Sequence, residues 1–355
     1  MADTAAQRLR WSTLEEEREL ALPGMGDRVT HPGFAGIEFV HVRAKSLLNH
    51  VPAAAGLPFE WTINVYRGCT HACRYCFARP SHTWLELDAG RDFESVIVVK
   101  VNAVERLRAE LRSPRWRGEH VALGTNTDPY QRCEGRYRLT RGVVATLAEA
   151  GNPFSVLTKG TLVARDLDLY VEAARRGVCT GVSMSIPTVD EQVWRTTEPG
   201  TPHPRARLET IARLAEAGIP TGVMIAPIIP GMSDAPDQLD AVVGAAVEAG
   251  AGSITPIVLH LRPGVREVFE PWLADVRPDL LERYRHLYRG TYAPEAERRR
   301  ISQQVHDLVA AYGGTRRPPQ RRGPLRRSPA PPPAHHPDRG DHVRDEVIGE
   351  QLTLL

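Results

Sequence analysis

Three of the chain's five cysteines lie within the segment RGCTHACRYCFARPSH, residues 67–82. Cys69, Cys73 and Cys76 are spaced C-x3-C-x2-C. Thiolates so close together repel one another, and burying them is costly unless a cation lies between them. The spacing therefore indicates a metal centre rather than three unrelated structural thiols. An odd number of cysteines, three of them clustered, also argues against a disulfide framework, so we expect a reducing cytoplasmic environment.

Two kinds of metal centre suit this pattern. A structural zinc site normally has four ligands, so Cys133 or His71 would have to supply the fourth. An iron–sulfur cubane held by three thiolates instead leaves one iron free to bind another molecule, and soft thiolates suit such clusters. The sequence favours the cluster, because a set of three ligands rather than four then serves the chemistry.

The elements that must position these cysteines form a repeating pattern of short apolar runs and amphipathic segments. The predicted strands are 61–66, 120–126, 153–159, 179–186, 220–229 and 253–259. The amphipathic segments end at glycines, a common residue after a helix: Gly151, Gly177, Gly218 and Gly250. Repeated strand-then-helix units with apolar strands predict a parallel sheet covered by helices. We expect an α/β fold of the partial (βα)6 TIM-type barrel kind, with a doubly wound open sheet as the alternative.

Segments of different composition flank this region. Residues 1–60 contain turn residues and one short apolar run, which predicts an irregular extension packed on the core, and residues 61–312 hold the barrel and C-terminal helices. Residues 313–345 are rich in proline and arginine, a composition typical of a disordered linker. The N-terminus lacks the apolar core of a secretion signal, and no run of about 18 apolar residues predicts a membrane span.

The cysteine motif, with Tyr75 before its last cysteine and a predicted strand before its first, resembles the radical S-adenosylmethionine (SAM) superfamily. Together with LGTNTDPYQ, VLTKG and VMIAPIIPGMSD, it resembles the spore photoproduct lyase-like branch over roughly residues 40–275. The resemblance implies a [4Fe–4S] cluster on Cys69, Cys73 and Cys76 whose open iron binds SAM. It also implies reductive cleavage of SAM to a 5′-deoxyadenosyl radical and an electron donor such as ferredoxin or flavodoxin. Tyr75 is then a candidate cofactor-binding residue.

Polar residues at the ends of the predicted strands are candidate SAM contacts, because ligands of parallel α/β barrels bind at the carboxyl ends of strands. Thr127 and Asp128 follow the second strand, and the resemblance assigns this segment to the SAM amine. Lys159 follows the third strand, and the resemblance assigns it to the SAM carboxylate. Ser183 and Ser185 alternate with apolar residues near the end of the fourth, where the family places ribose contacts.

Two further features bear on these assignments. Lys159 is one of only three lysines, whereas 42 of the 45 basic residues are arginine. A lysine in so arginine-rich a chain suggests that this position needs a compact, flexible ammonium. The apolar fifth strand, MIAPIIPG, is a candidate wall for stacking of the adenine.

The two remaining cysteines have different expectations. In spore photoproduct lyase a cysteine near the strand-two loop donates hydrogen to the product radical, which makes Cys133 a candidate hydrogen donor. The position that matches best is Thr125, however, so the specific lyase reaction on DNA lesions does not follow. Cys179 opens an apolar strand and is expected to be a buried thiol without chemistry.

The tail suggests partners. Six arginines within twelve residues predict salt-sensitive nucleic-acid binding: Arg316, Arg317, Arg321, Arg322, Arg326 and Arg327. The final peptide, residues 346–355, resembles the motif with which bacterial replication and repair proteins bind the sliding clamp, through Gln351, Leu352, Leu354 and Leu355. DNA is therefore the favoured partner. The alternatives are a radical SAM enzyme that modifies RNA or protein, and a metal-stabilised nucleic-acid-binding protein without catalysis.

Overall fold

The computed structural model describes residues 27–52 and 57–315. The arginine run, the predicted clamp-binding peptide and nearly all of the predicted linker lie beyond residue 315, outside the described residues, so they stay predictions. Residues 1–26 of the predicted extension also lie outside them. Within the described part, no helix combines the length and the apolar character that crossing a bilayer requires.

Six parallel strands form the main sheet, and their order in space is their order along the chain. They are β4 (Trp61–Ile63), β7 (Val121–Leu123), β8 (Phe154–Thr158), β9 (Thr180–Ser185), β10 (Thr221–Ile228) and β11 (Ile254–Val258). The short strand β3 (Asn49–His50) runs antiparallel to β4 at one edge. Sequential order with right-handed crossovers puts the connecting helices on one face, as in a barrel, whereas a doubly wound sheet would reverse its order. The predicted partial barrel is confirmed.

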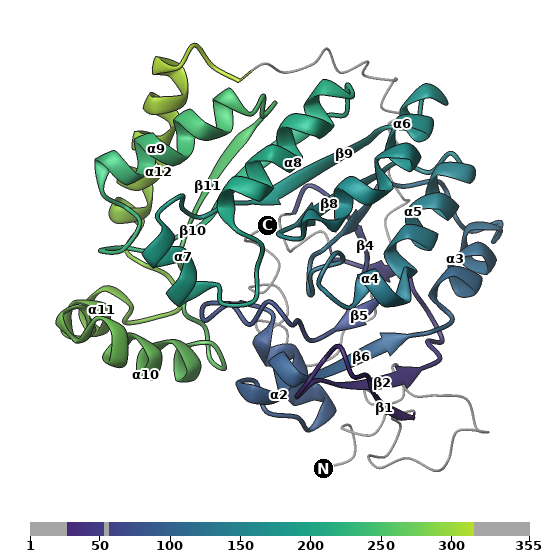
Figure 1. The fold of residues 1–355 in the computed structure, drawn as a ribbon, viewed down its shortest axis with the longest axis horizontal. Coiled ribbons are helices and arrows are strands. Elements are labelled where there is room, and N and C mark those ends of the chain that lie inside the picture. The colour runs from purple at the N-terminus through teal and green to yellow at the C-terminus, as the bar shows by residue number, and fades with distance from the viewer. Residues whose placement is uncertain (1–26, 53–56, 316–355) are drawn as a thin grey trace, which may run out of the picture.

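Helices between these strands cover the outside of the sheet, as Figure 1 shows. They are α3 (Ala103–Leu111), α5 (Leu139–Glu149), α6 (Leu167–Arg175), α8 (Pro204–Glu216) and α9 (Pro236–Glu248). α3 contacts α5, α5 contacts α6, and α9 contacts the C-terminal helix α12 (Glu295–Ala311). The predicted glycine ends are present: α9, for example, stops before Gly250, whose φ of 80° is a conformation that glycine adopts without a steric penalty.

The N-terminal part is more regular than the expected irregular extension. β1 (Arg28–Thr30) and β2 (Glu38–Val42) form a second sheet with β6 (Val96–Lys100) and β5 (Tyr66–Arg67). β6 is absent from the six predicted strands, although all five of its residues are buried. Its register places Glu38 opposite Val96, so the pairing joins segments nearly sixty residues apart. The predicted strand 61–66 is in fact divided: β4 belongs to the main sheet and β5 to the small one.

The remaining elements lie mostly in the connections at the carboxyl ends of the strands. They are η4 (Arg79–Leu85), α2 (Arg91–Ser95), α4 (Glu134–Tyr137), η5 (Thr161–Asp166), α7 (Glu191–Thr197), α10 (Arg266–Val276), η6 (Pro278–Leu280) and α11 (Leu281–Leu287). η4 and α2 follow the cysteine segment directly. α10 and α11 form a separate pair beside the barrel helices (Figure 1). These connections supply many of the residues around the cysteine segment.

Candidate active site

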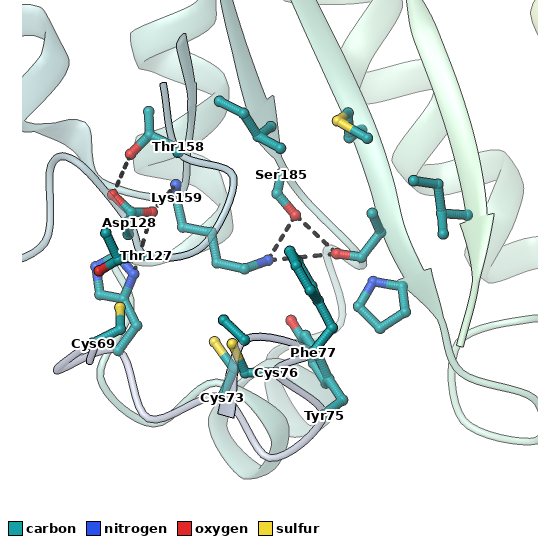
Figure 2. A pocket seen from close by; sticks show the side chains of 18 of the residues that line it. Cys69, Cys73, Tyr75, Cys76, Phe77, Thr127, Asp128, Thr158, Lys159 and Ser185 are labelled. Atoms are coloured by element: carbon teal, nitrogen blue, oxygen red, sulfur yellow. Dashed lines mark hydrogen bonds and ion pairs between the residues drawn. The ribbon is translucent and has the colours of Figure 1, made fainter. Parts of the chain in front are cut away.

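The three clustered cysteines lie on the loop that follows β5, at the mouth of the partial barrel. All three line one cavity, whose empty volume is about 860 Å³. Figure 2 shows their side chains on one side of this cavity, with Lys159 and Ser185 across from them. Cys69 and Cys73 are buried, Cys76 is half-buried, and all three are free thiols. The loop therefore presents three unpaired sulfurs to one space, where a metal group could bind them.

The three sulfurs do not, as they stand, form the ligand set of a single metal ion. Among the described residues, no three His, Cys, Asp or Glu side chains are grouped closely enough to hold one metal ion. Of the two possible fourth zinc ligands, Cys133 does not line the cavity, whereas His71 does and faces Asp128. Burial raises the pKa of all three thiols, so binding as thiolates needs a compensating cation.

The Cys69 side of the cavity is organised by Asp128, in the loop after β7. Its carboxylate accepts hydrogen bonds from the Thr158 hydroxyl at 2.6 Å and from the main-chain N–H of Lys159 at 2.6 Å. His71 Nδ1 lies 3.4 Å from Asp128 Oδ2. Burial raises the pKa of Asp128, but His71 and these hydrogen bonds outweigh burial and hold it below the ordinary value. Asp128 thus joins the ends of β7 and β8 to the cysteine loop.

Thr127 and Gln131 fasten the start of the cysteine loop. The Thr127 hydroxyl donates to the main-chain oxygen of Gly68 at 2.6 Å, and Gln131 Nε2 donates to the same oxygen at 3.0 Å. The Gln131 side-chain oxygen accepts the N–H of Thr70 at 2.9 Å. The hydroxyl of Thr127 is therefore engaged with the residue before Cys69, and it acts on the cavity by holding that cysteine.

Lys159 extends across the cavity towards the end of β9 (Figure 2). Its Nζ atom lies 2.7 Å from Glu198 Oε1 and donates to Ser185 Oγ at 2.7 Å. Glu198 also pairs with Arg207 at 2.5 Å and accepts a hydrogen bond from the Tyr75 hydroxyl. Burial raises the pKa of Glu198, but the two cations outweigh burial and lower it to about 2. The carboxylate therefore stays charged and orients both Lys159 and Tyr75.

The wall of the cavity that β10 forms is largely apolar. Met224, Ala226 and Pro227 of β10 line the cavity, at the predicted adenine wall. The pairing of β10 with β11 shifts register between Ile225 and Ile228, and the Ala226 oxygen accepts the Ser185 hydroxyl at 2.8 Å. His260, after β11, completes the wall. The cavity thus combines a sulfur edge, a charged centre and an apolar side.

The structure does not bring every predicted residue to this cavity. Ser183 is on the same strand as Ser185 but is not one of the lining residues. Cys133 lies at the start of α4 within the core, is 0% exposed, and does not line the cavity. The expectation of a buried Cys179 is wrong: this thiol is exposed, because it precedes the first residue of β9 at the far end of the sheet.

The sequence did not predict several side chains that support the site, among them Glu198, Arg207 and Gln131. Glu198 stands directly before Pro199 and Gly200, in the connection that follows the fourth predicted strand. An acidic residue in a turn on that side of a parallel sheet is a usable signal. Arg207 gives no such signal, because it is one of many arginines on an amphipathic helix.

Comparison with known proteins bears directly on this site. The profile of the Radical SAM superfamily matches residues 63–240, about half of the chain, including all three cavity cysteines. The chain belongs to the radical SAM superfamily. An uncharacterized protein of Mycobacterium tuberculosis is 49% identical over 306 residues, which cover 84% of this chain and 90% of the relative. An uncharacterized protein of Methanocaldococcus jannaschii is 29% identical over 200 residues, covering 56% and 70%.

This radical SAM protein also has a solved structural counterpart. A spore photoproduct lyase mutant with bound AdoMet and dinucleoside spore photoproduct superposes with a TM-score of 0.57. The match covers 77% of this chain and 78% of the lyase, at 18% sequence identity. At that identity the likeness establishes the shared radical SAM fold, and the architecture described above is the fold of this family.

Proposed function

We propose that this radical SAM enzyme binds a [4Fe–4S] cluster through Cys69, Cys73 and Cys76 and cleaves SAM reductively. One observation carries the proposal: the three cysteines of a C-x3-C-x2-C motif open onto the same cavity as Lys159 and Ser185, at the carboxyl ends of a parallel barrel. The chemistry that the cluster supplies when bound is one-electron cleavage of SAM to methionine and a 5′-deoxyadenosyl radical.

The chain's own residues bind and orient SAM in this proposal. Lys159 offers an ammonium to the SAM carboxylate, and Glu198 holds that ammonium in place. Ser185 offers a hydroxyl to the ribose, and the Thr127–Asp128 segment, which also lines the cavity, binds the SAM amine. The apolar wall from Met224 to Pro227 accommodates the adenine and keeps water from the radical.

We further propose that the substrate is a lesion in DNA. The support is the shared fold with spore photoproduct lyase, a protein that has been solved with a dinucleoside spore photoproduct. In this chain Cys133 is buried and does not line the cavity, which favours another donor for the hydrogen that completes such a repair. Modification of RNA or protein is the competing assignment, and the following assay distinguishes them.

The test is an anaerobic SAM-cleavage assay on the reconstituted full chain, with dithionite as the one-electron reductant. Release of 5′-deoxyadenosine that depends on all three cysteines supports the radical SAM assignment, and its absence contradicts it. Ultraviolet-irradiated oligonucleotide, undamaged oligonucleotide and RNA are then added in turn. We expect faster turnover, with loss of the lesion, only with irradiated DNA. In the cell, a ferredoxin or flavodoxin in a reducing cytoplasm would replace dithionite.

A further inference from the structure

The turn that follows β11 is fastened to the cysteine loop through Arg262. Its Nη2 atom donates a hydrogen bond to the main-chain oxygen of Phe77, the residue after Cys76, and its guanidinium lies 5.7 Å from the centre of the Phe77 ring. Two residues further on, a Cβ atom at Gly264 would come within 2.8 Å of Pro80 Cγ. The turn and the cysteine loop are therefore in close contact directly beside Cys76.

Arg262 has charge and hydrogen-bonding capacity that the described residues do not use. Its Nε atom is buried and has no hydrogen-bond partner among them. No carboxylate of residues 27–52 or 57–315 forms an ion pair with it, whereas Arg79 pairs with Glu94 and Lys159 pairs with Glu198. Arg262 is half-buried, and removing a guanidinium from water without a counter-charge is unfavourable. A compensating anion is therefore expected at this point.

The contact with Phe77 sets the position of this charge. Phe77 follows Cys76 directly along the chain, and Arg262 donates to its main-chain oxygen. Both Cys76 and Phe77 line the cavity. The positive charge of the turn therefore lies at the Cys76 edge of the cavity.

We propose that Arg262 is the charge partner of the iron–sulfur cluster on its Cys76 side and raises the reduction potential of that cluster. This inference rests on the proposed function. One electron from a low-potential reductant, of the flavodoxin or ferredoxin class, adds one negative charge and forms or breaks no bond. A fixed cation nearby stabilises the more negative state, and N–H donors to sulfur act in the same direction. Arg262 thus acts through the cluster and is a positioning residue.

The test is an EPR-monitored redox titration of the reconstituted full chain and its Arg262→Gln and Arg262→Lys variants, with dithionite as reductant. For Arg262→Gln we expect unchanged iron content and an about tenfold lower ratio of reduced to oxidised cluster at a fixed potential, equal to about 59 mV for one electron. Arg262→Lys keeps the charge and should stay within about threefold of the parent, a smaller electrostatic change. The matched control is Arg266→Gln, because Arg266 lies in the same connection but pairs with Glu270.

Each outcome decides the inference. Parental potential in an Arg262→Gln protein with full iron content overturns it, and so does an equal shift in the Arg266→Gln control. If Arg262→Gln fails to retain iron, Arg262→Lys decides: full iron at near-parental potential supports the charge role, and loss of iron there too means that Arg262 only fastens the turn. A parent chain that takes up no [4Fe–4S] cluster would instead contradict the proposed function itself.

Discussion

The two ends of the cysteine motif lie in opposite electrostatic surroundings. Burial raises the pKa of the Cys69 thiol, and the neighbouring Asp128 raises it further. Burial also raises the pKa of the Cys76 thiol, but three cations oppose it: Arg79, Lys159 and Arg262. Three thiols within one short loop are therefore not equivalent. On the Cys76 flank, the cations around that thiol can compensate negative charge. On the Cys69 flank, the loops are held together by the hydrogen bonds of Asp128.

The carboxylate on the Cys69 flank is tolerated because its charge is already satisfied. Asp128 accepts hydrogen bonds from Thr158, Tyr130 and Lys159 and faces His71. Its role is to fix the loops around Cys69. On the other flank, Lys159 and the Arg262 turn reach the loop from β8 and β11, which lie several strands apart. The comparison suggests that one flank sets geometry and the other sets charge.

The largest effect is expected from removing one of the three cysteines, on which both flanks depend. Replacing Cys69, Cys73 or Cys76 singly by Ala leaves two thiolates, which do not hold a cubane, so each variant should lose its cluster and all SAM cleavage. Iron and acid-labile sulfide content after anaerobic reconstitution measures this. Cys133→Ala and Cys179→Ala are the controls and should keep the cluster, because neither side chain lines the cavity. SAM cleavage at the parental rate in any of the three variants would refute the ligand assignment.

The next largest effect tests the anchor of the cationic flank. Glu198→Gln leaves Arg207, which is 0% exposed, without its counter-charge. Breaking a buried pair in this way should lower the free energy of unfolding by about 3–5 kcal/mol. Urea denaturation of the cluster-free chain measures it. Glu191→Gln is the matched control, since the exposed Glu191–Arg195 pair should contribute about 0–1 kcal/mol. Equal destabilisation by the two changes would show that Glu198 anchors nothing.

The same carboxylate gives a prediction about pH. The folded pKa of Glu198 is about 2, below its ordinary value of 4.5, because Arg207 and Lys159 outweigh the effect of burial. A lowered pKa stabilises the fold fully above the ordinary value, and that stabilisation is lost as the pH falls through the folded value. The difference in unfolding free energy between the parent and Glu198→Gln should therefore shrink from pH 5 towards pH 2, across the window between those two pKa values. A constant difference over this range would contradict the charged state.

A smaller effect separates binding of SAM from binding of the cluster. If the Lys159 ammonium pairs with the SAM carboxylate, Lys159→Ala should weaken SAM binding by about 1.5–3 kcal/mol, the range for a charged hydrogen bond. Cluster content should not change, because Glu198 remains paired with Arg207. Calorimetry of SAM binding to the reconstituted protein measures the affinity. An unaltered affinity would leave Lys159 with a purely structural role beside Glu198.

The smallest effect compares two serines on one strand. Ser185 contacts Lys159 at 2.7 Å and lines the cavity, whereas Ser183 does not line it. We expect Ser185→Ala to weaken SAM binding by about 0.5–1.5 kcal/mol, the net value of one hydrogen bond. Ser183→Ala should leave the affinity close to that of the parent. A larger loss in Ser183→Ala would restore the ribose contact expected from the sequence.

The sequence alone determined the features that depend on local pattern. Each of the six predicted strands contains a strand of the main sheet, and helices α5 and α9 end before Gly151 and Gly250 as expected. Apolar runs and glycine positions report burial and backbone conformation within one segment, so they predict elements well. The cysteine spacing is equally local, and it was enough to predict the family.

Tertiary structure alone decided which distant residues meet. β6 pairs with β2, so the second sheet depends on a contact across nearly sixty residues that no local period reveals. The partners of Lys159 and of the cysteine loop, Glu198 and Arg262, come from connections after β9 and β11. The sequence made both Cys76 and Cys133 candidates for the site, yet Cys133 is enclosed in the core and Cys76 opens onto the cavity. Charge and access are properties of the three-dimensional neighbourhood, because Coulomb interactions and solvent exclusion depend on distance in space rather than on distance along the chain.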